Sequence, residues 1–207
     1  MPTPIEFYFD LLSPFGYLGS TQIERIAARH GREVDWRPVL IGVTVLKVMG
    51  LKPVADTPLK GPYSKRDALR LATWLGVPFR FHGLTGVNSL AASRAFLWIK
   101  QRDAALAKRF AARIYERLWV RAEDITPPEA AAEEAAALGI DRTELLTALG
   151  HDEAKRALKD AVDRAIERGV FGVPFFIADD EPFWGCDHLP MLEYWLEHHT
   201  WTRPGDR

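Results

Sequence analysis

The first eighteen residues read as a strand, a tight turn and a helix. Apolar and more polar side chains alternate from Ile5 to Asp10, which is the period of two typical of a strand. Ser13-Pro14 then predicts a helix start, because serine is a favoured N-cap and proline at the next position loses no helix hydrogen bond. A helix N-terminus at the end of a strand stabilises negative charge, so we expect an anion or a thiolate beside Ser13. On this pattern alone, the alternative that Ser13 only caps the helix stays open.

A second strand is predicted over residues 33–40, where Val34 and Trp36 alternate with polar neighbours. Pro38 indicates that its end lies at an edge or a bend. Strand, helix and strand within about forty residues form a βαβ unit, so the two strands are expected to be parallel.

The next 128 residues, 41–168, contain no convincing strand. A loop rich in glycine and proline is expected at 50–62. Residues such as Asn88-Ser89 resemble helix starts, and Gly76 resembles a helix end. The predicted helices cover residues 63–75, 88–100, 104–120, 128–138, 142–149 and 152–167.

Strands return near the C-terminus. Residues 173–178 and 181–184 read as a hairpin joined by Asp179-Asp180, and residues 187–199 read as a closing helix. The order βαβ, helices, ββα predicts an α/β protein with a thioredoxin-like fold, interrupted by a large helical insertion. We assign residues 1–40 and 169–207 to the thioredoxin-like domain and residues 41–168 to the insertion.

Composition narrows the function classes. The chain has 207 residues, 47% of them hydrophobic, and a formal net charge of −1 with no dense basic run, so a nucleic-acid partner is not expected. The N-terminus reads directly into a strand and no apolar run is long enough to span a bilayer, which predicts a cytoplasmic protein without a membrane partner. His198-His199 lacks a third ligand at suitable spacing, so no metal site is expected.

Ser13 and Gly16 occupy the two positions at which redox proteins of this fold carry Cys-x-x-Cys. Thiol-disulfide exchange needs a thiolate and a second sulfur, and the single cysteine, Cys186, lies elsewhere. Dithiol oxidoreductase chemistry is therefore excluded. Val173-Pro174, before the third strand, is expected to be a cis bond facing Ser13, with the Val173 backbone free to pair with an extended peptide.

Five segments, in this order and spacing, resemble the 2-hydroxychromene-2-carboxylate isomerases, relatives of kappa-class glutathione transferases with a DsbA-like thioredoxin fold. The segments are residues 7–18 (FYFDLLSPFGYL), 47–53 (KVMGLKP), 88–89 (NS), 170–174 (VFGVP) and 183–187 (FWGCD). The resemblance covers nearly the whole chain. Related sequences commonly have Asn at the position of Leu51, Ser or Asn at that of Cys186 and Arg at that of His188.

This resemblance implies a glutathione-dependent isomerase. It places Ser13 against the glutathione sulfur and Val173 against the glutathione backbone. It also implies that Gly185, Cys186 and Asp187 bind the γ-glutamyl end of glutathione and that Lys47 and Asn88 lie near the aromatic substrate. A homodimer is also expected, since dimers are common among relatives.

The implied reaction interconverts 2-hydroxychromene-2-carboxylate and trans-o-hydroxybenzylidenepyruvate, an aromatic hydroxy-keto acid of naphthalene catabolism. Reversible addition of a thiolate makes the double bond single and lets it rotate. Two alternatives stay open: a kappa-like transferase that conjugates glutathione to an electrophile, and a non-catalytic module that binds thiols or peptides.

Other conspicuous residues have ordinary structural interpretations. Tyr17, Trp74 and Trp119 are expected in the core. Asp67 and Arg70 are expected to be solvated charges. Cys186 is expected to be a packed thiol, although a reactive one near a helix start is an alternative.

Overall fold

A four-stranded mixed sheet forms the centre of the computed structural model, which describes residues 3–202. The sheet order is β2-β1-β3-β4, in which β1 and β2 are parallel and the pairs β1–β3 and β3–β4 are antiparallel. The strands are β1 (Ile5–Phe9), β2 (Val34–Pro38), β3 (Phe175–Ala178) and β4 (Glu181–Trp184). This arrangement confirms the predicted βαβ unit and C-terminal hairpin.

The hairpin turn has the local chemistry that its sequence predicts. Asp179 and Asp180 both have positive φ, 53° and 66°. A two-residue turn of this hand matches the twist of the flanking strands, and aspartate tolerates it better than most residues.

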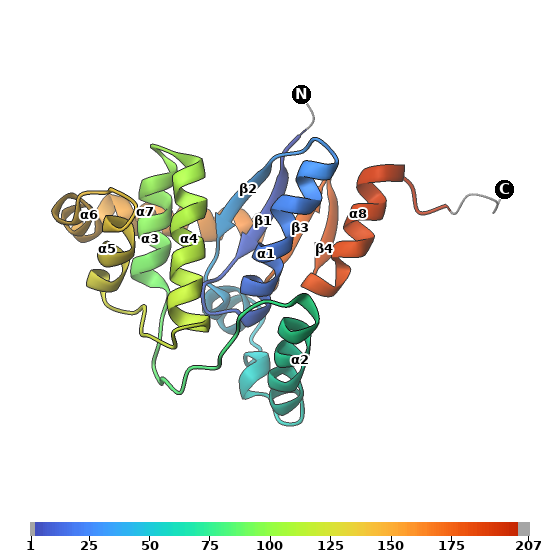
Figure 1. Ribbon diagram of the computed structural model, residues 1–207, viewed down its shortest axis with the longest axis horizontal. Coiled ribbons are helices and arrows are strands. Elements are labelled where there is room, and N and C mark those ends of the chain that lie inside the picture. Colours follow the sequence, from blue (N-terminus) through green and yellow to red (C-terminus); the bar gives the residue numbers. More distant parts are fainter. Residues whose placement is uncertain (1–2, 203–207) are drawn as a thin grey trace.

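Two helices cover one face of the sheet: α1 (Pro14–Arg29) and α8 (Leu189–His198) (Figure 1). Phe7 lies in the middle of that face, stacked on Phe176 with ring centres 5.1 Å apart and edge-on to Trp36 at 4.8 Å. All three side chains are buried. Aromatic pairs in these geometries add to the burial energy, and these two pairs connect β2, β1 and β3.

The helical insertion contains six α-helices: α2 (Lys60–Leu75), α3 (Leu90–Lys100), α4 (Ala104–Trp119), α5 (Pro128–Ala136), α6 (Arg142–Gly150) and α7 (Asp152–Glu167). One continuous cluster of buried apolar side chains runs from the sheet into these helices, including Phe96 and Phe110. α7 packs against α3 and also against β2, where Ala165 joins Tyr8 on the second face of the sheet. The thioredoxin-like fold with a helical insertion is therefore confirmed.

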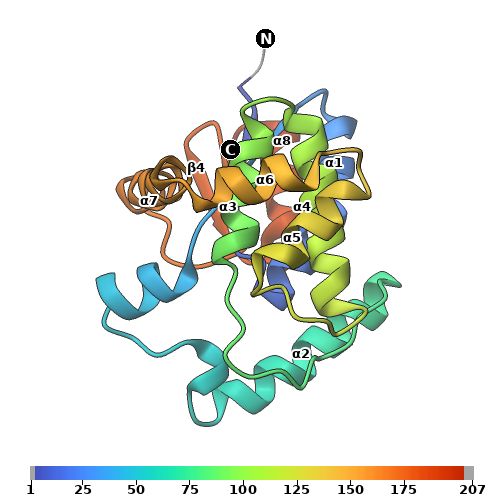
Figure 2. The same cartoon turned by 90° about the vertical axis from the view of Figure 1, so that its left-hand side faces the viewer.

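The segment between β2 and α2 differs most from its predicted structure. Residues Gly42–Val48 form a π-helix and Val54–Asp56 a short 3-10 helix within the predicted loop. α2 begins at Lys60, three residues early, because Pro62 falls in the first turn, where its missing N–H breaks no helix bond. Figure 2 shows α2 and this segment set apart from the other helices.

Two further differences concern side-chain burial and a helix start. Trp74 was expected in the core but is 85% exposed, because α2 packs few of its residues and Trp74 lies on the face that points away. The closing helix starts with a 3-10 turn, Cys186–His188, before α8. Tyr17 and Trp119 are buried, as predicted.

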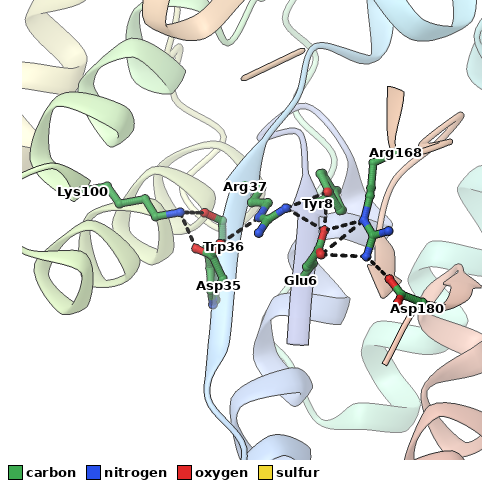
Figure 3. Close-up of polar contacts among 8 residues, drawn as sticks. All are labelled: Glu6, Tyr8, Asp35, Trp36, Arg37, Lys100, Arg168 and Asp180. Carbon is green, nitrogen blue, oxygen red and sulfur yellow. Dashed lines mark hydrogen bonds and ion pairs between the residues drawn. The ribbon is translucent and has the colours of Figure 1, made fainter. Parts of the chain in front are cut away.

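A network of ion pairs crosses the opposite face of the sheet (Figure 3). Glu6 accepts hydrogen bonds from Tyr8 at 2.5 Å, Arg37 at 2.6 Å and Arg168 at 3.1 Å. Lys100, at the end of α3, binds the Asp35 carboxylate and donates to the Trp36 carbonyl at 2.8 Å. The network thus ties β1 and β2 to the helical insertion.

Candidate active site at the N-terminus of α1

Ser13 caps α1 and keeps one hydrogen-bonding function unused. Its backbone is extended (φ −90°, ψ 118°), and its hydroxyl oxygen accepts the Gly16 N–H at 3.0 Å. Within residues 3–202 the Ser13 hydroxyl donates its proton to no acceptor. The side chain is nearly buried and lies at the helix N-terminus, where a negative charge is favoured.

The turn before Ser13 is held by the buried carboxylate of Asp10. One carboxylate oxygen accepts the Leu12 N–H at 3.0 Å and the Ser89 hydroxyl at 2.7 Å, and the other accepts the Ile41 N–H at 2.9 Å. Burial raises the pKa of Asp10, while these three donors act to lower it. These contacts join the turn before α1 to Ile41, which follows β2, and to Ser89, which precedes α3.

Two aromatic side chains of α4 hold the backbone of the same turn. The Tyr115 hydroxyl donates to the Asp10 carbonyl at 3.2 Å, and the Trp119 indole donates to the Leu11 carbonyl at 3.0 Å. Gly16 makes this packing possible, because a Cβ there would lie 2.8 Å from the Tyr115 hydroxyl oxygen. The turn is therefore fixed by the helical insertion as well as by the sheet.

Val173 and Pro174 lie at the same edge of the sheet as Ser13. The peptide bond between them is cis, as predicted. The pairing of Tyr8 with Phe175 on antiparallel strands carries Val173 to the level of Asp10, and Pro174 packs against Gly19 of α1, where a Cβ would be 3.3 Å away. Outside its helices and strands, the described chain forms no backbone hydrogen bond to Val173.

The end of β4 brings Gly185, Cys186 and Asp187 to this edge as well. The Gly185 N–H donates to the Pro174 carbonyl at 2.9 Å, and Gly185 has a φ of 97°, which a side chain would strain. The Asp187 side chain is 79% exposed and lies 3.6 Å from His188. Cys186 is buried, and burial together with the Asp187 charge raises the pKa of its thiol to about 12.

The two residues assigned to the substrate are placed differently. Asn88 is half-buried and adjoins Ser89, so its backbone lies beside Asp10; its side chain accepts the Leu90 N–H at 3.2 Å. Ser89 is the N-cap of α3 by position, but its hydroxyl binds Asp10 instead of the helix. Lys47 is exposed on the π-helix, and its ammonium makes no hydrogen bond or ion pair within residues 3–202.

Asp67 belongs near this site, although its sequence context indicated only a solvated charge. Its carboxylate is paired with Arg70 at 2.5 Å on α2 and contributes to the raised pKa of Cys186. Sequence reasoning also gave no role to Asp10 or Tyr115, and it placed Trp119 in the core without its hydrogen bond to the turn. Asp10 carried a usable signal, because an acidic residue at the end of a buried strand needs nearby donors.

No group of three or more His, Cys, Asp and Glu side chains in the described part of the chain is arranged to hold a metal ion. Within the same residues, no helix is both long and apolar enough to cross a membrane.

Comparisons with known proteins agree with this geometry. The DSBA-like thioredoxin domain family matches residues 4–197. Over 200 residues the chain is 30% identical to 2-hydroxychromene-2-carboxylate isomerase of Sphingobium xenophagum, covering 95% of this chain and 99% of that protein. The chain belongs to this isomerase family. It is therefore an enzyme.

Two further relatives of this isomerase-family chain bear on its activity. It is 28% identical over 216 residues to glutathione S-transferase kappa 1 of Homo sapiens, covering 99% of this chain and 95% of that protein. The structure of a 2-hydroxychromene-2-carboxylate isomerase superposes with a TM-score of 0.85 at 27% identity, covering 95% of this chain and 96% of the other. The family thus includes both isomerases and transferases.

Proposed function

We propose that this enzyme uses glutathione to interconvert 2-hydroxychromene-2-carboxylate and trans-o-hydroxybenzylidenepyruvate. The observation that carries the proposal is the Ser13 hydroxyl, which has an unused proton at the N-terminus of α1 beside the Val173-Pro174 edge. The names of its relatives, isomerases at 30% identity and a kappa-class transferase at 28%, support the same reaction class and cofactor.

The residues at this edge fit glutathione. Ser13 offers a hydroxyl donor for a sulfur anion, Val173 offers a free backbone N–H and C=O for an extended peptide, and Asp187 offers an exposed carboxylate for an ammonium group. Asp67 adds negative charge on the Asp187 side of the site. Gly185 and Cys186 would contact glutathione through their backbone atoms and the shape of the surface they form. The Cys186 thiol stays protonated, so it would not supply a charge.

The chemistry that glutathione supplies is reversible addition of its thiolate to the conjugated double bond, which becomes single, rotates, and is restored when the thiolate leaves. The Ser13 hydroxyl donates a hydrogen bond to the sulfur anion, and the N-terminus of α1 adds a favourable electrostatic field. Ser13 therefore lowers the thiol pKa and forms no covalent bond itself. Lys47 and Asn88 are proposed to face the carboxylate and hydroxyl groups of the aromatic substrate.

The decisive test follows the absorbance of 2-hydroxychromene-2-carboxylate with purified protein, with and without glutathione. Rapid conversion that requires glutathione would establish the reaction and the cofactor together. No conversion at any glutathione concentration would reject this substrate.

A kappa-like transferase is the second candidate, favoured by the 28% identity to the human kappa enzyme over 99% of this chain. The same glutathione site serves a conjugation reaction, in which the C–S bond persists. Mass spectrometry separates the two, because a transferase accumulates a glutathione adduct and an isomerase returns free glutathione.

We also propose that the enzyme is a homodimer. Nine of the fifteen exposed large apolar side chains in the described residues lie between Leu46 and Trp74, on the segment set apart in Figure 2. Apolar surface concentrated in this way is typical of an interface. Light scattering tests the proposal: a mass near twice the 23.4 kDa of the chain supports it, and a monomer rejects it.

A further inference from the structure

A surface cavity of about 450 Å³ lies between α3, α6 and α7, away from the residues of the candidate active site. Figure 2 shows α6 crossing in front of α3, with α7 beside them. We call this space the α3–α6–α7 cavity. Its size is within the range of about 300–1,000 Å³ found for small-molecule sites.

One wall of the cavity, formed by α3 and the turn that follows it, carries two arginines and a tryptophan. Arg94 and Trp98 of α3 and Arg102, two residues beyond the end of the helix, are spaced by four residues and line this same wall. The Arg102 guanidinium lies 3.6 Å from the centre of the Trp98 ring and donates to the Trp98 carbonyl at 2.9 Å. These contacts hold Arg102 over the ring.

Arg94 is the unsatisfied group in this wall. Its Nε atom is buried without a hydrogen-bond partner, and its guanidinium has no ion pair with any carboxylate among residues 3–202. A partly buried guanidinium without an acceptor is unfavourable, and a carboxylate can bind the two Nη groups of such an arginine in a bidentate manner.

The acidic residues that line the cavity are engaged elsewhere or lie at its rim. The Asp141 carboxylate caps α6 by accepting the Glu144 N–H at 2.7 Å. Glu144 faces Arg102 at 3.9 Å, and Glu153 is exposed. None of the three is within ion-pair distance of Arg94.

The remaining walls are mixed. Ala148 of α6 and Ala154 and Ala157 of α7 supply apolar surface beside that of Trp98, and Gln101, Thr143, Thr147 and His151 supply polar groups. This lining, with an arginine that has no acceptor, suits a ligand that combines an apolar body with an anionic group.

We propose that the α3–α6–α7 cavity binds a small organic carboxylate, with the carboxylate on Arg94 and the apolar part against Trp98 and the three alanines. This site is separate from the glutathione site, and the inference does not depend on the proposed function. Its occupant would bridge α3, α6 and α7.

The experiment is a titration of the wild-type protein with salicylate, followed by two-dimensional NMR of the tryptophan indole N–H groups. The Trp98 signal is assigned with Trp98→Phe. Salicylamide, which has the same ring without the charge, and inorganic phosphate are titrated in parallel. The variants are Arg94→Met, Arg94→Lys and the control Arg109→Met, which removes an exposed arginine of α4 outside the cavity.

Salicylate should shift the Trp98 signal saturably in the wild type and in Arg109→Met. Its affinity should fall about tenfold or more in Arg94→Met and less in Arg94→Lys, since lysine keeps the charge without the bidentate geometry. Salicylamide should bind much more weakly than salicylate.

Three outcomes would overturn the proposal: no Trp98 shift with salicylate, equal binding of salicylamide, or binding of phosphate alone. The comparison of salicylate with salicylamide uses only the wild type, so it decides the matter even if Arg94→Met fails to fold. Lys47→Met removes the cation proposed to face the substrate carboxylate and should leave this titration unchanged, which separates the cavity from salicylate bound at the active site.

Discussion

The Ser89 hydroxyl donates a hydrogen bond of 2.7 Å to the carboxylate of Asp10, which lies 79 residues earlier in the chain. This contact joins the first residue after β1 to the start of α3. Because Asp10 also holds Leu12 and Ile41, one carboxylate positions the turn that leads to Ser13. The geometry of the candidate active site therefore depends on a side chain that would not itself touch a ligand.

Asp10→Ala should destabilise the protein by about 2–3 kcal/mol, because one buried and two partly buried donors lose their acceptor, although the mutation also removes the cost of burying a charge. Thermal and denaturant unfolding measure this loss. Asp160→Ala, on the exposed face of α7, is the matched control and should leave the melting temperature unchanged. Equal melting temperatures for the two variants would contradict the role of Asp10.

Asp10 should also contribute to the pH dependence of stability. Burial raises its folded-state pKa above the ordinary value of 3.8, so between these two values the folded state binds more protons than the unfolded chain. The contribution of Asp10 to the free energy of unfolding is therefore fully present at pH values below 3.8, the ordinary pKa. It is lost as pH rises through the raised pKa of the folded state. Asp10→Asn does not titrate, so its stability relative to wild type should improve as pH rises through this window. Denaturant unfolding at several pH values from about 4 upward tests this, and parallel curves would refute it.

Ser13→Ala should raise the apparent pKa of bound glutathione by about one unit, because the sulfur anion loses a hydrogen bond from a hydroxyl. It should also cost about 1 kcal/mol of stability through the lost N-cap. The pH dependence of turnover reports the first effect. Ser20→Ala, which removes a hydroxyl bonded to the Tyr17 carbonyl on the same helix, should leave that profile in place. A wild-type profile in Ser13→Ala would exclude the proposed role.

Cys186 should be unreactive in the folded enzyme. Burial raises the pKa of its thiol to about 12, whereas a free cysteine titrates near about 8.5, so its thiolate fraction at neutral pH is roughly a thousandfold smaller. Alkylation by iodoacetamide, followed by mass spectrometry, should therefore be at least about a hundredfold slower than for glutathione, and should become fast on denaturation. Rapid modification of the native protein would show that the thiol is accessible and ionised.

Glu6→Gln should destabilise the sheet by about 1–2 kcal/mol, since Tyr8, Arg37 and Arg168 share this one carboxylate (Figure 3). Both arginines are about two-fifths exposed, which limits the effect. Added salt should reduce the destabilisation by Glu6→Gln further, because it screens exposed charges. Asp163→Asn breaks an exposed pair with Lys159 on α7 and should not change the melting temperature. An equal effect of the two substitutions would place Glu6 among ordinary surface charges.

Local chemistry explains why much of the fold was predictable. The alternation from Ile5 to Phe9, the Ser13-Pro14 cap and the Asp179-Asp180 turn each depend on neighbouring residues in the chain. Their order along the sequence then leaves few arrangements of a sheet and its covering helices. The same order, together with the five segments that begin with residues 7–18, was enough to indicate the family.

The segment from Ile41 to Trp74 was predicted less well, because its structure depends on distant contacts. A π-helix has no distinct sequence pattern, and Ile41 is held by Asp10 from another element. Trp74 belongs to a helix whose apolar residues suggest burial, yet no element within residues 3–202 covers it. Burial is a property of what packs against a residue, which the helix itself does not specify.

For the candidate active site, the sequence by itself determined which groups are present: a serine at a helix N-terminus, no Cys-x-x-Cys pair, and a Val-Pro bond before the third strand. Only the tertiary structure decided how the site is held, with Asp10 on Ser89 and Ile41 and the Tyr115 and Trp119 side chains on the turn. Among residues 3–202 it also left Arg94 without a partner, in the α3–α6–α7 cavity. The physical reason is that caps and turns are made by residues adjacent in sequence, whereas a buried polar group takes its partners from whichever elements the fold brings to it.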